Sequence, residues 1–211
     1  MCRSHLEASD RWESIGSRVW RSAFSNTMNL PNQLTVLRLV LTVPFVVALS
    51  IDFPGSKILA LALFVIGSVT DYADGYIARK YQLITDFGKL MDPLVDKIMT
   101  AAAFICLVAL SYIPAWAVIV IVGREFLITG LRLIAVSRGK VLPAERLGKH
   151  KTVWQIVTIL YFLVVAAVTA GGRMSAPFLI FGWFLIIVTV GLTLWSGVSY
   201  LVKNRELISG G

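Results

Sequence analysis

Four aspartates with helical spacing are the residues of this chain best suited to chemistry. Five of its 12 acidic residues lie between positions 71 and 96. Asp71 and Asp74 are three residues apart, and Asp92 and Asp96 are four apart, so each pair lies on one face of a helix. The surrounding residues are apolar enough for a membrane, where an ionised group is costly unless it is paired or solvated. We therefore expect these four aspartates to be functional.

Two antiparallel helices would bring the four carboxylates together. With a connecting loop at about residues 81–86, Asp74 and Asp92 would both lie ~9–10 Å from the cytoplasmic end. Carboxylates this close cannot all stay ionised without counter-ions. Oxygen ligands without imidazole or thiolate favour Mg²⁺ or Mn²⁺, so we expect one or two such ions, holding phosphate oxygens. The alternative is a structural network in which the aspartates pair with Arg79, Lys89 or Lys97.

Six apolar segments are expected to position these residues. They lie at about 34–49, 58–78, 87–113, 116–135, 152–170 and 178–201, with turn residues between them. Segments that cross a bilayer in this way must be helices, because lipid cannot satisfy exposed backbone groups. The chain is 57% hydrophobic and 15% charged, with a mean hydropathy of +0.77, which excludes a disordered chain or a small disulfide scaffold. The sequence predicts an all-α integral membrane protein with six transmembrane helices.

The basic residues predict how these helices are oriented. Of 20 Lys and Arg, 14 fall on one side of the predicted membrane and two, Lys57 and Arg173, on the other. By the positive-inside rule, both termini and the site formed by the four aspartates face the cytoplasm of an inner or plasma membrane. Contact with anionic lipid headgroups accounts for the net charge of +8 without nucleic acid.

Residues 1–27 form an arm ahead of a six-helix domain at 28–211. Apolar residues in the arm recur at helical spacing, at Trp12, Ile15, Val19 and Ala23. Basic residues lie elsewhere on the helical wheel, at Arg11, Arg18 and Arg21. This pattern predicts an interfacial amphipathic helix on the cytoplasmic surface. An equally weighted reading starts the protein at Met28 and treats the arm as an upstream extension.

The acidic segment reads D-x-x-D-G-x-x-A-R, eight residues, then G-x-x-x-D-x-x-x-D. It resembles the signature of the CDP-alcohol phosphotransferase family. The matching positions are Asp71, Asp74, Gly75, Ala78, Arg79, Gly88, Asp92 and Asp96. The resemblance implies a membrane enzyme with six spanning helices that works as a homodimer and depends on Mg²⁺ or Mn²⁺.

The resemblance covers most of residues 28–155. Residues 31–38 resemble the start of the family's first span. Residues 91–97, 124–132 and 148–152 resemble the branch that makes phosphatidylglycerol phosphate. This implies transfer of the phosphatidyl group from CDP-diacylglycerol to sn-glycerol 3-phosphate, with release of CMP. A branch with inositol phosphate, serine or a lipid as acceptor would share the metal residues. An aspartate-rich prenyltransferase and a cation transporter are alternatives from other classes.

The resemblance also assigns roles to the signature residues. Asp71, Asp74 and Asp92 would ligate metal ions, and Asp96 would adjoin the metals and act as general base on the acceptor hydroxyl. Gly75, Ala78, Arg79 and Gly88 would shape the nucleotide pocket. The predicted CDP-diacylglycerol site comprises Asn32, Thr35, Asp71, Asp74, Gly75, Ala78, Arg79 and Gly88.

Basic residues in or beside the spans need partners, because unpaired charge is expensive there. An anionic acceptor phosphate would provide one. The predicted acceptor-phosphate ligands are Arg38, Arg124, Arg132, Lys149 and Lys151. Two of these predictions have specific alternatives. Arg124 could pair with Glu125 or an aspartate, and Arg38 could neutralise the aspartate cluster.

Overall fold

The computed structural model describes six α-helices. They are α2 (Leu30–Ser50), α3 (Ser56–Tyr81), α4 (Asp86–Ala109), α5 (Ala115–Ser137), α6 (Arg146–Val168) and α7 (Ala176–Lys203). The structure describes residues 30–81, 86–137, 146–169 and 175–205, and their side chains over 37–70, 97–135, 150–169 and 175–205. The predicted interfacial helix at residues 1–27 lies outside these ranges. Within them there is no strand, as the all-α prediction requires.

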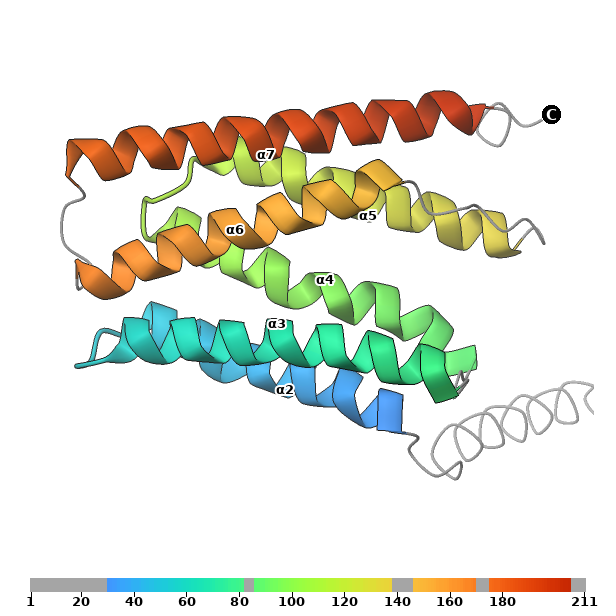
Figure 1. The fold of residues 1–211 in the computed structure, drawn as a ribbon, viewed down its shortest axis with the longest axis horizontal. Helices are drawn as coiled ribbons and strands as arrows, with labels where there is room; N and C mark the ends of the chain where they lie inside the picture. Colours follow the sequence, from blue (N-terminus) through green and yellow to red (C-terminus); the bar gives the residue numbers. More distant parts are fainter. Residues whose placement is uncertain (1–29, 82–85, 138–145, 170–174, 206–211) are drawn as a thin grey trace, which may run out of the picture.

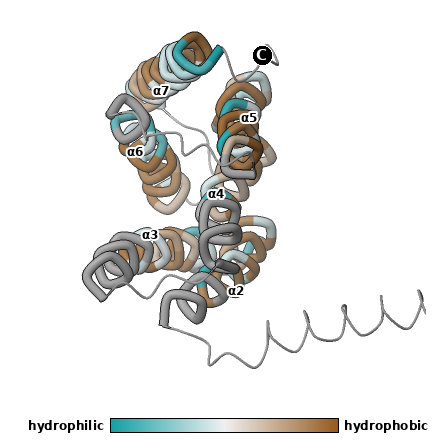
Figure 2. Tube along the Cα trace, turned by 90° about the vertical axis from the view of Figure 1, so that its right-hand side faces the viewer, coloured by the Kyte–Doolittle hydropathy of each residue, from teal (hydrophilic) through white to brown (hydrophobic). Residues whose placement is uncertain are grey.

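The helices run alternately up and down the long axis of the bundle (Figure 1). The starts of α2, α4 and α6 therefore lie at the same end as the ends of α3, α5 and α7. Helix α2 packs on α3 and α4, while α7 packs on α5 and α6. Contacts of α4 with α5 and of α3 with α6 join these two groups, which are seen almost end-on in Figure 2.

The outer surface of the bundle is strongly apolar. Ile119, Val168 and Ile180 are at least 70% exposed, on three different helices. A water-soluble monomer rarely exposes so much apolar surface, whereas a bilayer accommodates it. The buried core is formed by other large apolar residues, among them Phe45, Phe64, Phe104 and Phe162. Apolar side chains thus fill the inside and also cover the outside of the bundle.

Two helices of the described residues are long and apolar enough to cross a membrane, at His150–Val168 and Ala176–Lys203. Shorter apolar helical segments lie at Leu37–Ser50, Ser56–Thr70 and Lys97–Ala109. Helix α5 has 23 residues and a high apolar content, but it contains Arg124, Glu125 and Arg132. Two of the charges that interrupt α5, Arg124 and Glu125, also belong to the polar network described below.

The predicted and observed helix boundaries differ by a few residues, and the end of α4 and the start of α6 are among the largest differences. The third apolar segment was expected to continue to residue 113, but α4 ends at Ala109. Ser111 adopts a left-handed backbone conformation (φ 59°), and the carbonyl of Leu107 accepts a hydrogen bond of 2.9 Å from the Tyr112 N–H. Apolar side chains thus continue beyond a turn that ends the helix. At the other boundary, α6 begins at Arg146, earlier than the expected residue 152.

Lys57 links α2 to α3 at the end of the bundle opposite the acidic segment. Its side chain is buried and donates a 2.9 Å hydrogen bond to the carbonyl of Leu49, near the end of α2. Its Nζ atom also lies 2.8 Å from a carboxylate oxygen of Asp52. A cation at a helix C-terminus is favoured by the helix dipole. Lys57 is therefore held by intramolecular partners at the end predicted to carry few cations.

Candidate active site

The acidic signature lies on α3 and α4, close to the connection between them (Figure 1). Asp71 and Asp74 lie on α3, and Asp92 and Asp96 lie on α4. Their backbones are helical, as predicted, and their side chains lie outside the described residues. The same holds for the other predicted nucleotide-binding residues, namely Asn32, Thr35, Gly75, Ala78, Arg79 and Gly88.

A close contact between Gly67 and Met99 aligns these two helices. A Cβ atom on Gly67 would lie 2.5 Å from the Met99 sulfur, so the absent side chain permits the contact. Asp74 lies seven residues after Gly67, and Asp92 lies seven residues before Met99. Because α3 and α4 run in opposite directions, both positions are about 10 Å from the contact, toward the same end.

The other two aspartates obey the same alignment. Asp71 lies four residues after Gly67, and Asp96 lies three residues before Met99. Both backbone positions are thus about 5 Å from the contact along their helices. In chain order, Gly67, Asp71 and Asp74 are four and then three residues apart, and so are Asp92, Asp96 and Met99. This spacing places the three residues of each helix on one face. Along the bundle, Asp74 and Asp92 therefore lie at one level, and Asp71 and Asp96 lie at another.

A cavity of about 100 Å³ lies beside the contact, inside the bundle. Its lining comes from α2, α3, α4, α5 and α6 and includes both Gly67 and Met99. The polar residues that line it include Arg38, Ser68, Lys97, Glu125, Thr152 and Gln155. Lys97 directly follows Asp96 in the chain, and Ser68 precedes Asp71 by three residues. The polar cavity thus adjoins the acidic positions.

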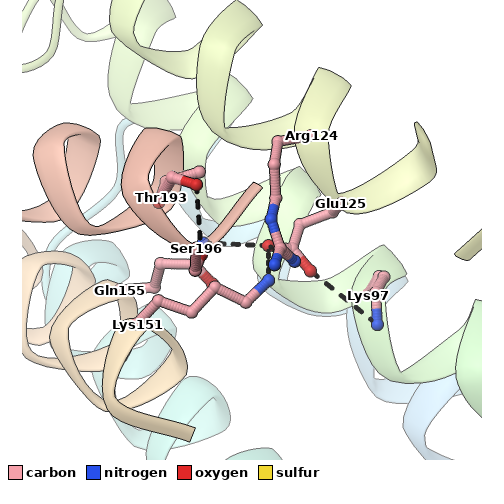
Figure 3. A network of polar contacts seen from close by, with 7 residues as sticks. All are labelled: Lys97, Arg124, Glu125, Lys151, Gln155, Thr193 and Ser196. Atoms are coloured by element: carbon pink, nitrogen blue, oxygen red, sulfur yellow. Dashed lines mark hydrogen bonds and ion pairs between the residues drawn. The ribbon is translucent and has the colours of Figure 1, made fainter. Parts of the chain in front are cut away.

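Glu125 is the centre of a polar network at the wall of this cavity (Figure 3). Its Oε1 atom accepts a hydrogen bond from the Lys151 ammonium group. The same oxygen lies 3.4 Å from Nε2 of Gln155 and 3.5 Å from a terminal guanidinium nitrogen of Arg124. Its Oε2 atom lies 3.9 Å from the Lys97 ammonium group. One carboxylate on α5 therefore connects α4 and α6.

The structure places three predicted acceptor ligands in different surroundings. Arg38 is 8% exposed and lines the cavity. Arg124 pairs with Glu125, which was the alternative considered from the sequence. Lys151 also binds Glu125, and neither Arg124 nor Lys151 belongs to the cavity lining. The structure thus brings these cations to one region, but only Arg38 lines the cavity, whereas Arg124 and Lys151 contact the carboxylate of Glu125.

Arg132 lies farther along α5 and contacts α7 instead. Its Nε atom donates a 3.3 Å hydrogen bond to the Tyr200 hydroxyl, and its guanidinium carbon lies 5.4 Å from the centre of the Tyr200 ring. Arg132 is not part of the cavity lining. The side chain of Lys149, the remaining predicted acceptor ligand, lies outside the described residues.

Sequence reasoning missed the central position of Glu125 and did not identify Gln155. A signal for both was present. Glu125 is an acidic residue within an apolar segment, which is a functional candidate by default. Gln155 lies four residues after Lys151, and therefore on the same face of α6. Over the part of the chain with described side chains, no group of three or more potential metal-ligating side chains occurs.

Comparison with known proteins identifies the family of this chain. The sequence profile of the CDP-alcohol phosphatidyltransferase family matches residues 28–195. The CDP-diacylglycerol–glycerol-3-phosphate 3-phosphatidyltransferase of Bacillus subtilis (strain 168) is 38% identical over 196 residues, which cover 85% of this chain and 97% of the relative.

Two further relatives agree. The enzyme of the same name from Mycoplasma pneumoniae is 34% identical, over 84% of this chain and 87% of the relative. A probable phosphatidylglycerophosphate synthase of Mycobacterium tuberculosis (strain H37Rv) is 35% identical, over 86% of this chain and 84% of the relative. This chain therefore belongs to the CDP-alcohol phosphatidyltransferase family, which confirms the family predicted from the acidic signature.

Proposed function

We propose that this protein transfers the phosphatidyl group of CDP-diacylglycerol to sn-glycerol 3-phosphate, forming phosphatidylglycerol phosphate and CMP. Relatives that match most of the chain carry the name of this activity. The structural observation that carries the proposal is the alignment of α3 and α4 at Gly67 and Met99. It supports a site in which four aspartates at matching levels adjoin a polar cavity with basic residues.

The donor chemistry of the signature fits a divalent ion. Members of this family use divalent metal ions. Asp71, Asp74 and Asp92 are the proposed ligands and Asp96 adjoins them, and this all-oxygen set suits Mg²⁺ or Mn²⁺. Two ions are proposed, because four carboxylates at close quarters need several positive charges. When bound, such ions offset negative charge on the diphosphate and on the departing CMP.

Asp96 is the proposed general base. Its neighbour in the chain, Lys97, lines the cavity, which supports a role for Asp96 near the acceptor. Asp96 accepts the proton of an acceptor hydroxyl, whose oxygen forms a bond to the lipid-linked phosphorus as the bond to CMP breaks. Asn32, Thr35, Gly75, Ala78, Arg79 and Gly88 remain the proposed nucleotide-binding residues.

The cavity is the proposed acceptor site. Arg38 and Lys97 line it, and both are suited to hold a phosphate group. Arg124, Arg132, Lys149 and Lys151 remain proposed contributors to the positive potential that attracts the acceptor. The cavity opens among helices whose outer surfaces are apolar, which suits a lipid donor whose acyl chains stay in the bilayer.

The proposed setting is a multi-pass enzyme of an inner or plasma membrane. Members of the family are membrane enzymes, and two apolar helices of this chain are long enough to span a bilayer. Both termini and the active site are proposed to face the cytoplasm, where the basic residues meet anionic lipids. A homodimer is the proposed assembly.

The test is an assay of CMP release by detergent-purified protein. The protein is given CDP-diacylglycerol, Mg²⁺ and one acceptor at a time: sn-glycerol 3-phosphate, inositol phosphate or serine. We expect CMP release with sn-glycerol 3-phosphate alone, and the loss of that release with EDTA. Release with a different acceptor only would overturn the proposed acceptor, while leaving the family chemistry in place.

A further inference from the structure

We propose that Glu125 is a positioning residue, whose carboxylate holds the Lys97 ammonium group at the edge of the cavity where the acceptor's phosphate binds. Lys151 and Arg124 then affect acceptor binding only through Glu125, and neither of them contacts the acceptor. The inference rests on the proposed function, because it assumes that the acceptor carries a phosphate group.

The first support is the arrangement of the charged groups relative to the cavity. Lys97 and Glu125 both line the cavity, whereas Lys151 and Arg124 do not. Lys151 and Arg124 contact Oε1 of Glu125, and Lys97 lies near Oε2 (Figure 3). An anion in the cavity can therefore meet Lys97 directly, whereas Lys151 and Arg124 are linked to the cavity lining through their contacts with Glu125.

The second support is the charge balance of this group. A lone glutamate at the cavity wall would repel a phosphate and would satisfy Lys97 by itself. Here Lys151 and Arg124 offset the charge of Glu125, and Lys151 is the most deeply buried of the set, with a side chain only 5% exposed. The carboxylate can thus fix Lys97 in place while the cavity wall keeps a positive excess for an anion.

The third support is that Glu125 has little freedom to move. Its side chain is 15% exposed, and Gln155 also lies within hydrogen-bonding distance of Oε1. The stem of Arg124 packs against Gly197 of α7, where a Cβ atom would lie 3.0 Å from Arg124 Cγ. Helices α6 and α7 thus restrain both residues of this α5 pair. A group held in this way can orient a flexible lysine for its ligand.

The test compares substrate constants for variants of Glu125. Glu125→Gln keeps the size of the side chain and removes its charge. We expect it to raise the apparent KM for sn-glycerol 3-phosphate by about tenfold or more, the effect of losing one well-placed charge-assisted contact. The apparent KM for CDP-diacylglycerol should stay within about twofold of wild type. Glu125→Asp keeps the charge on a shorter side chain, and its KM for sn-glycerol 3-phosphate should lie between those of wild type and Glu125→Gln.

A double variant tests whether Glu125 acts through Lys97. Lys97→Ala should raise the acceptor KM, and adding Glu125→Gln should raise it no further, because the residue to be positioned is gone. The matched control is Thr158→Val, which removes the buried 2.8 Å hydrogen bond between Thr158 and Thr189 without touching the charged group. It should leave both KM values near wild type.

Three results would overturn the inference. A lower acceptor KM in Glu125→Gln would mean that Glu125 competes with the phosphate. Additive effects in the double variant would mean that Glu125 does not act through Lys97. Equal changes in both KM values would indicate a purely structural role. If Glu125→Gln does not fold, the same comparison of acceptor KM with donor KM is made with Glu125→Asp. Wild-type activity with another phosphate-bearing acceptor would refute the proposed function alone, since the variants can then be assayed with that acceptor.

Discussion

Gly67 offers the most direct test of the alignment of α3 and α4. In Gly67→Ala, the new Cβ atom would lie 2.5 Å from the sulfur and 2.7 Å from the terminal methyl of Met99. Favourable separations are about 3.5–4.0 Å, so these atoms must move apart by about 1 Å. Met99 has a flexible side chain and lines the cavity, so its thioether is expected to swing into that space.

The magnitude follows from opposing effects. Alanine is favoured over glycine inside a helix by about 0.5–1 kcal/mol, and overpacking a core costs about 1–3 kcal/mol. We therefore expect Gly67→Ala to lower the free energy of unfolding by no more than about 2.5 kcal/mol. Activity should be affected more selectively. A thioether inside a cavity of about 100 Å³ should raise the KM for sn-glycerol 3-phosphate and leave the Mg²⁺ requirement unchanged.

In Gly67→Leu the new side chain is too large to be accommodated by movement of Met99 alone, so α3 and α4 must separate. A displacement of about 1 Å at the aspartates exceeds the few tenths of an ångström that a metal site tolerates, and can lower kcat by roughly a hundredfold. The assay is CMP release at varied Mg²⁺ and acceptor concentrations. Gly67→Ala combined with Met99→Ala is the control and should restore the acceptor KM. Wild-type kinetics in Gly67→Leu would refute the claim that this contact aligns the acidic positions.

Three further predictions use the same assay or a melting curve. Asp96→Asn should abolish CMP release while CDP-diacylglycerol still binds in a direct binding assay, and substantial turnover would remove Asp96 as the base. Lys149→Ala combined with Lys151→Ala should raise the KM for the acceptor more than that for the donor, and an unchanged acceptor KM would mean that neither lysine contributes to acceptor binding. Tyr200→Phe removes the hydroxyl that accepts a hydrogen bond from Arg132, and should lower the free energy of unfolding by about 1–3 kcal/mol. The melting temperature in detergent measures this loss, and an unchanged value would argue against Arg132 as a link between α5 and α7.

The acidic signature could be read from the sequence because its spacing is local. Asp71 with Asp74, and Asp92 with Asp96, fall on helix faces through the helical repeat alone. The helices themselves were predicted for the same reason, since each apolar segment is continuous in the chain. The predicted end at residue 113 was wrong because apolar content does not report a backbone turn, and the turn at Ser111 depends on a single left-handed residue.

Only the tertiary structure decided how these helices meet. The Gly67–Met99 contact joins residues 32 positions apart, and Arg132 and Tyr200 are 68 apart. The sequence indicated Glu125 as a partner of Arg124 and as part of a segment that resembles the family, but its contacts with Lys97 and Lys151 come from separate helices. Such contacts depend on the rotation and spacing of whole helices, which are set by how all their side chains pack together. Local spacing along the chain therefore determines which groups share a face, and packing determines which faces meet.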